Sequence, residues 1–132
     1  MKKSYRTLEF SFIQDYIKNY CFSEMAKKRI DQIQPFQDID DLKLYQDDIS
    51  SAMKIIYAYG RIPLAPYEDI KEILQKAQKG GVCYPQDLLK IVQILKNVQE
   101  VQAYLDQEIE QSHLLEILSL LYLPKDLYNE IL

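Results

Sequence analysis

Apolar side chains recur along the chain at intervals of three and four residues, and no stretch alternates apolar and polar residues for long enough to predict a strand. The first stripe runs from Leu8 to Tyr20 and predicts a helix. Ser23 is a suitable N-cap for a second helix that runs toward Pro35. The pattern predicts an all-α protein, a multi-helix bundle of about six to seven helices.

A third helix is expected after Asp38, because acidic residues gather where the positive end of its dipole would lie. Gly60 is expected to end this helix. Its apolar positions are Leu42, Tyr45, Ile49, Ala52, Met53 and Ile56.

Residues 60–66, Gly-Arg-Ile-Pro-Leu-Ala-Pro, contain two prolines, which predict an ordered connector between two helical halves, 1–59 and 67–132. A fourth helix is expected from about Tyr67 to the Gly80-Gly81 pair, and these two glycines, like Gly60, are expected to supply positive φ at a helix end. Pro85 suits the first position of a fifth helix of some twenty residues, on whose apolar face Gln102 is a polar interruption.

The last third of the chain is the most apolar. The segment from His113 to Leu123 is expected to lie at the centre of the helical core, and Pro124 to open a final short helix ending at Leu132. The chain ends on two apolar residues without a cap, from which we expect a piece of a longer protein.

The composition fits one soluble domain, with 132 residues of which 48% are apolar and 27% charged. The three glycines, Gly60, Gly80 and Gly81, do not have the spacing of either phosphate-binding glycine motif, and one histidine with two distant cysteines gives no zinc-binding spacing. We therefore predict no catalytic, cofactor-binding or metal-binding residue in this chain. No membrane span or signal peptide is recognised, so we expect a cytoplasmic protein with Cys21 and Cys83 as free thiols.

The net charge of −4 has the wrong sign for a domain that grips nucleic acid over a broad surface. Lys27, Lys28 and Arg29 form the densest basic run, which could touch a phosphate backbone, although a solvated helix face is the favoured interpretation. His113 is interpreted as a helix-start residue and not as a general base. Eleven tyrosines could suggest base stacking, but Tyr16, Tyr20, Tyr45 and Tyr59 stand at helical intervals beside aliphatic residues, so packing in the core and its rim is the favoured interpretation.

Specific residues resemble a known family. The order G-x-I-P-L, D-I, L-x-x-A-x-x-G-G-V and L-L, with matching spacing, resembles the bacterial MutS paralogue that carries an Smr domain, the MutS-two family, and the likeness covers essentially all 132 residues. One departure is Tyr84, which replaces a small hydroxyl cap before Pro85 and should weaken the start of that helix by roughly 1 kcal/mol unless another group caps it. The signature positions, all with expected structural roles, are Thr7, Leu8, Glu9, Phe10, Pro35, Gly60, Ile62, Pro63, Leu64, Asp69, Ile70, Gly80, Gly81 and Val82.

The resemblance implies the N-terminal part of a MutS-type core, or lever, domain within a parent protein several times longer. The parent would be a homodimeric ATPase and endonuclease that uses ATP and Mg, suppresses recombination on branched DNA and acts on collided ribosomes. The partners of this chain would be the clamp and ATPase domains of that parent, and DNA or the ribosome through them. The alternative is an independent helical adapter that binds a partner protein.

Overall fold

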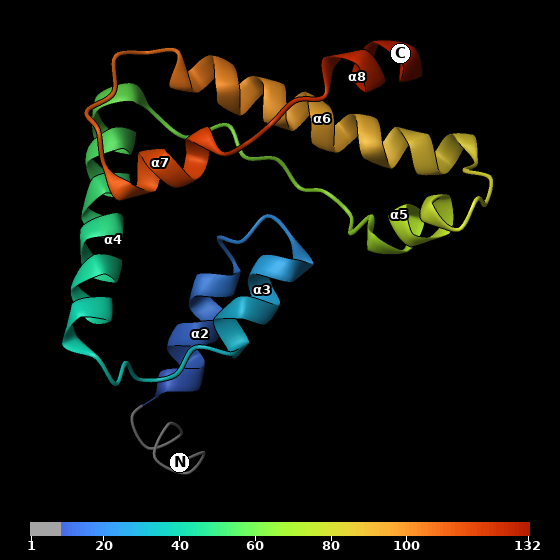
Figure 1. Ribbon diagram of the computed structural model, residues 1–132. Coiled ribbons are helices and arrows are strands. Elements are labelled where there is room, and N and C mark those ends of the chain that lie inside the picture. The colour runs from blue at the N-terminus through green and yellow to red at the C-terminus, as the bar shows by residue number, and fades with distance from the viewer. Residues whose placement is uncertain (1–8) are drawn as a thin grey trace.

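The computed structural model describes residues 9–132, and this part of the chain contains seven helices and no strand (Figure 1). The predicted all-α class is confirmed. The helices are α2 (Phe10–Lys18), α3 (Glu24–Asp31), α4 (Ile39–Tyr59), α5 (Lys71–Gln78), α6 (Pro85–Leu105), α7 (His113–Ser119) and α8 (Lys125–Ile131). Thr7 and Leu8 of the predicted signature lie outside the described residues.

The helix starts follow the capping residues that the sequence contains. The Ser23 hydroxyl accepts from the Ala26 N–H at 3.1 Å, and the Asp38 carboxylate accepts from the Asp40 N–H at 2.8 Å. Tyr84 supplies no short side-chain cap, but the Asp87 carboxylate accepts from the Tyr84 backbone N–H at 3.0 Å. That bond supplies one half of a capping box, so another group does cap the start of α6.

Two predictions are wrong, one about where a helix begins and one about which segment lies at the centre of the core. The fourth helix begins at Lys71 and not near Tyr67, because residues 66–68 are held against α6 and the Asp69 carboxylate accepts from the Lys71 N–H at 2.9 Å. The apolar segment after His113 is helical only to Ser119 and is not the centre of a core. Leu115 and Leu123 are buried, whereas Leu120 and Tyr122 are 80% and 78% exposed, since α7 packs mainly on α4.

The two predicted helix-end glycine sites are only partly confirmed. Gly60 and Gly80 have the positive φ values of 83° and 76° that favour glycine. Gly81 does not, so its predicted role is wrong. Its N–H donates to the Lys76 carbonyl at 2.9 Å, and a Cβ at Gly81 would lie 2.7 Å from Lys76 Cγ and 2.9 Å from that carbonyl oxygen. Gly81 is therefore required by close approach and not by its backbone angle.

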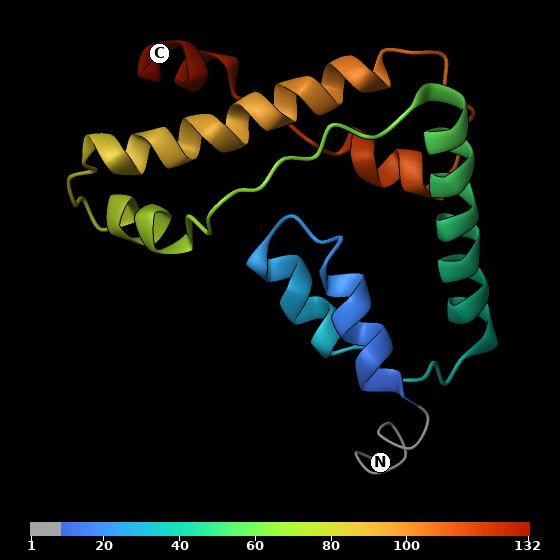
Figure 2. The same ribbon diagram turned by 180° about the vertical axis from the view of Figure 1, so that it is seen from behind.

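The helices pack in pairs in an open arrangement (Figures 1 and 2). Helices α2 and α3 lie side by side, α7 packs on α4, and α8 packs on α6. The connector that follows α4 runs along α6 to reach α5 (Figure 1). Few apolar side chains are buried in the part of the chain that is described: Ile55, Ile73, Val92, Leu95, Val101, Leu115 and Leu123.

The accessible surface is large for the size of the chain. It measures 10918 Å², and a folded monomer of 15.6 kDa ordinarily exposes about 7200 Å². The tyrosines contribute to this surface. Tyr16 and Tyr20, predicted to pack in the core or its rim, are exposed and pack on each other, with ring centroids 5.5 Å apart and hydroxyls 3.1 Å apart. Much of the apolar surface on α2 and α4 is therefore left uncovered by the rest of residues 9–132.

Candidate functional site

The connector is fixed to α6 by side chains that reach its backbone. Asn97 carries the central contact, because its amide nitrogen donates to the Pro63 carbonyl at 2.6 Å and its amide oxygen accepts from the Ala65 N–H at 3.2 Å. Proline denies the connector two backbone donors, so it cannot form a regular ladder of its own. The Asn97 side chain supplies the missing partners from the neighbouring helix.

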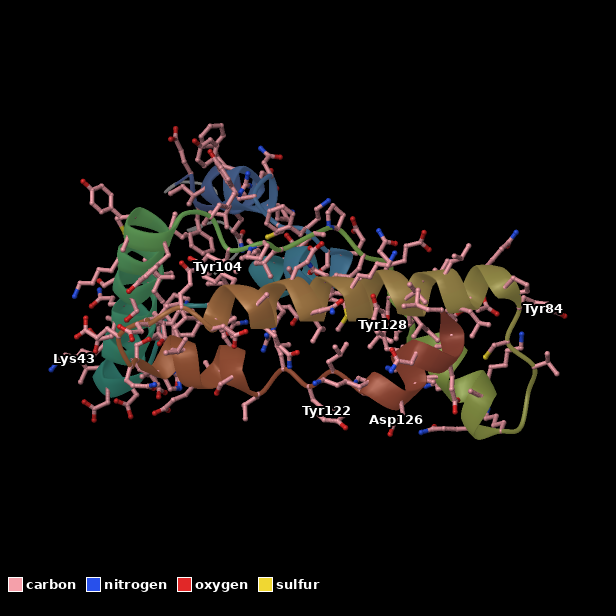
Figure 3. The ribbon with its side chains drawn as sticks, turned by 90° about the horizontal axis from the view of Figure 1, so that it is seen from above. Lys43, Tyr84, Tyr104, Tyr122, Asp126 and Tyr128 are labelled. Atoms are coloured by element: carbon pink, nitrogen blue, oxygen red, sulfur yellow. The ribbon has the colours of Figure 1, made fainter. Side chains whose placement is uncertain are left out.

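Further contacts extend this attachment in both directions along α6. The Tyr104 hydroxyl donates to the Gly60 carbonyl at 2.8 Å, at the end where α4 stops (Figure 3). Gln93 donates to the Pro66 carbonyl at 3.2 Å, and Lys90 forms an ion pair with Glu68 at 2.5 Å. We call Lys90, Gln93, Asn97 and Tyr104 the α6 strap; their spacing of three, four and seven residues places them on one face of the helix.

The environment of the strap shifts two of its pKa values. A hydrogen bond to Glu68, with the charge of that carboxylate, raises the pKa of Lys90 above its ordinary value. Burial raises the pKa of Tyr104, and the nearby Tyr59 phenol adds to this effect. The Tyr59 hydroxyl in turn donates to the Glu108 carbonyl in the loop after α6. The strap is thus held with Lys90 charged and Tyr104 neutral at physiological pH.

Gln102 and His113 each make a contact that joins distant parts of the chain. Gln102, predicted only as a polar interruption, donates to the Leu121 carbonyl at 3.0 Å and so ties the segment between α7 and α8 to α6. His113 begins α7, as predicted, and its Nδ1 lies 2.8 Å from Oδ1 of Asp48 on α4. Sequence reasoning did not find either partner, because both lie far away along the chain.

Most of the signature residues lie in the connector, just before α5, or in the turn between α5 and α6. Ile62 and Pro63 are half-buried, whereas Leu64 is exposed next to the strap contacts. Asp69 and Ile70 precede α5, and Val82 is exposed in the turn after it. Glu9 occupies the N-cap position of α2 in a left-handed conformation with φ 54°, and its side chain makes no capping hydrogen bond. Phe10 begins α2 half-buried, and Pro35 is exposed between α3 and α4.

The basic run lies on α3 and is largely solvated. Lys27 forms an ion pair with Glu24 on the same helix at 3.2 Å, whereas Lys28 and Arg29 are exposed in the last turn. Cys21 and Cys83 are half-buried free thiols, as predicted. Within residues 9–132 no three side chains of the metal-binding types converge. No helix of the described segment is long and apolar enough to cross a membrane.

The comparisons with known proteins agree with the signature residues. The chain is 32% identical over 133 aligned positions to a protein named Endonuclease MutS2 from Clostridium botulinum (strain Alaska E43 / Type E3), a match that covers 98% of the chain. It is 31% identical over 113 positions to the protein of the same name from Clostridium beijerinckii, covering 85% of the chain. No family model matches. The chain spans 17% and 14% of these two relatives, respectively, and the predicted resemblance is confirmed.

Proposed function

We propose that this chain, homologous along 98% of its length to a region of Endonuclease MutS2, is the non-catalytic N-terminal part of the core, or lever, domain of such a protein. The full-length similarity is the observation that carries this proposal. The α6 strap supports it, because a segment that transmits motion needs packed, connected elements more than reactive groups.

The contacts of the α6 strap support the proposed lever role, because they join the connector to α6. Asn97 and Tyr104 join the connector to a helix of 21 residues, so displacement of the connector would be passed to the whole of α6. In the parent, ATP and Mg would bind in a separate ATPase domain, and this chain would relay the resulting motion to a clamp. The clients of that clamp would be branched DNA, on which the parent suppresses recombination, or collided ribosomes.

The proposal is tested first on the purified chain and then on a longer protein that contains it. The chain alone should neither hydrolyse ATP nor cut branched DNA. In the longer protein, Asn97→Ala should leave basal ATP hydrolysis intact and abolish its stimulation by branched DNA. Gln99→Ala, on an exposed part of the same helix, is the matched control and should change neither rate.

Two results would contradict this proposal. ATP turnover by the pure chain would place catalysis here. A reading frame that stops directly after Leu132 would leave nothing for a lever to move and would favour the independent adapter. A frame that continues into a clamp and a nucleotide-binding loop is the expected result.

A further inference from the structure

Helices α2 and α3 are joined to each other by polar contacts between their side chains and backbone. The Gln14 side-chain amide donates to the Ile30 carbonyl at 2.9 Å. The Lys18 ammonium forms an ion pair with Asp31 at 2.6 Å. We call residues 10–31, which comprise α2, the short turn and α3, the α2–α3 hairpin. Because these contacts cross from one helix to the other, the hairpin can move as one unit.

The turn of the hairpin faces the connector, whereas the segment that leaves α3 runs to the start of α4 (Figures 1 and 2). The Arg61 guanidinium lies over the Phe22 ring, with its Cζ 5.4 Å from the ring centroid. A cation in this position is attracted by the negative face of the ring. Arg61 directly follows Gly60, whose carbonyl accepts from the Tyr104 hydroxyl. The contact therefore ties the turn of the hairpin to the part of the connector that the α6 strap holds.

An open cleft of about 440 Å³ lies beside this contact, between the hairpin and the connector. Glu24 and Lys27 line the cleft from the hairpin, and Glu68 and Gln93 line it from the other side. The charges are paired within each wall, because Lys27 lies 3.2 Å from Glu24 and Glu68 lies 2.5 Å from Lys90. A hydrated cleft with these polar walls does not fix the hairpin as a packed apolar interface would. The Arg61–Phe22 contact is thus the attachment on which this end of the hairpin depends.

The other end of the hairpin is attached to α4 through a short segment. The Phe36 ring packs on the Tyr45 ring of α4, with centroids 5.0 Å apart. Residues 33–36 belong to no helix, and Pro35 prevents the segment from joining α3 and α4 into one helix. A few such residues between two packed elements can absorb the backbone rotation of a hinge.

We propose that the α2–α3 hairpin is a hinged lobe, which swings about residues 32–36 and is held closed on the connector by the Arg61–Phe22 contact. This inference does not depend on the proposed lever function. An exposed cation–π contact favours the state that contains it by roughly two- to fivefold. A bias of this size holds the lobe closed and still allows it to open, so the contact acts as a weak latch.

Pulsed electron paramagnetic resonance on the purified chain tests the hinge. One spin label is placed at Met25→Cys on α3 and the other at Gln99→Cys on α6, both exposed positions. Cys21 and Cys83 are replaced by serine in all proteins, and circular dichroism verifies that the helices form. The chain with the latch intact should show a main distance for the closed lobe and a minor, longer distance for the released lobe. One narrow distance that no latch variant changes would overturn the hinge.

Three variants test the latch by the ratio of the released to the closed population. Arg61→Ala, at an exposed position, should raise this ratio roughly two- to fivefold. Phe22→Leu should raise it as well, because it keeps an apolar side chain and removes the ring. Arg29→Ala removes another exposed arginine, on α3, and should leave the ratio unchanged. A ratio that Arg61→Ala leaves unchanged, or that Arg29→Ala raises equally, would overturn the latch.

Discussion

His113 and Asp48 meet across 65 positions of sequence, with the imidazole Nδ1 2.8 Å from one carboxylate oxygen and 3.0 Å from the other. The contact joins the first residue of α7 to the middle of α4. Both side chains are partly exposed, which limits the strength of this contact because water competes for the same polar atoms. The pair nevertheless fixes where the short helix α7 begins on α4.

A double-mutant cycle measures this contact. His113→Ala and Asp48→Ala should show a coupling of about 0.2–1 kcal/mol in the free energy of unfolding by urea. Asp47→Ala, at the exposed neighbouring position, should show no coupling with His113→Ala. Equal coupling for Asp47 would mean that the effect is general charge and not the observed pair.

Tyr104 predicts a dependence of stability on alkaline pH. Burial raises its pKa above the ordinary tyrosine value of 10.0, so the folded state favours the neutral phenol. The stability that this preference adds to the free energy of unfolding is fully present below pH 10.0. It is lost as the pH rises through the pKa of Tyr104 in the folded protein.

The variant that tests this is Tyr104→Phe. Near pH 8 it should cost about 0.5–1.5 kcal/mol, since the hydrogen bond to Gly60 is lost. The difference between the two proteins in urea unfolding should shrink above pH 10. A difference that stays constant across this range would show that the partly buried Tyr104 phenol does not titrate as inferred.

The two glycines after α5 should respond differently to substitution. Gly80→Ala should cost about 1–2 kcal/mol because of its positive φ, and Gly80→Val should lower the melting temperature further. Gly80→Asn should cost less, since asparagine tolerates this conformation. Gly81→Ala and Gly81→Asn should both destabilise through the clash with the Lys76 carbonyl. An unchanged melting temperature for Gly80→Val would contradict the account of this turn.

The basic run on α3 should bind DNA only weakly. Binding of labelled branched DNA by the chain should fall steeply between low and physiological salt, because phosphate contacts release counterions. Replacing Lys27, Lys28 and Arg29 by glutamine should remove what binding there is. Micromolar affinity that persists in this triple variant would place the nucleic-acid contact elsewhere in the chain.

The helices were predictable because their signals are local. The caps Ser23 and Asp38, the prolines and the apolar spacing lie within a few residues of the helix starts that they specify. The start of α5 was mispredicted because contacts from α6 hold residues 66–68 outside a helix. The exposure of Leu120 and Tyr122 was missed because apolar spacing does not show whether a covering surface is present in the same chain.

The α6 strap could not be predicted from the sequence. Asn97 lies 34 residues from Pro63 and Tyr104 lies 44 residues from Gly60, so nothing local relates them. The sequence of the connector does indicate that it needs partners from another element. Its two prolines cannot continue a regular hydrogen-bonding pattern, so carbonyls in the connector need donors from elsewhere. Asn97 and Gln102 were the polar residues near an apolar helix face that could have supplied them.

The central claim is that the connector and α6 form one body through Asn97. Hydrogen exchange of the Ala65 amide tests it most directly, because that N–H donates to the Asn97 side chain. In the unaltered chain this amide should exchange slowly. In Asn97→Ala it should exchange much faster, with about 1–3 kcal/mol lost from the free energy of unfolding. Gln99→Ala should leave the exchange rate unchanged, whereas fast exchange in the unaltered chain, or equal protection after Asn97→Ala, would contradict the claim.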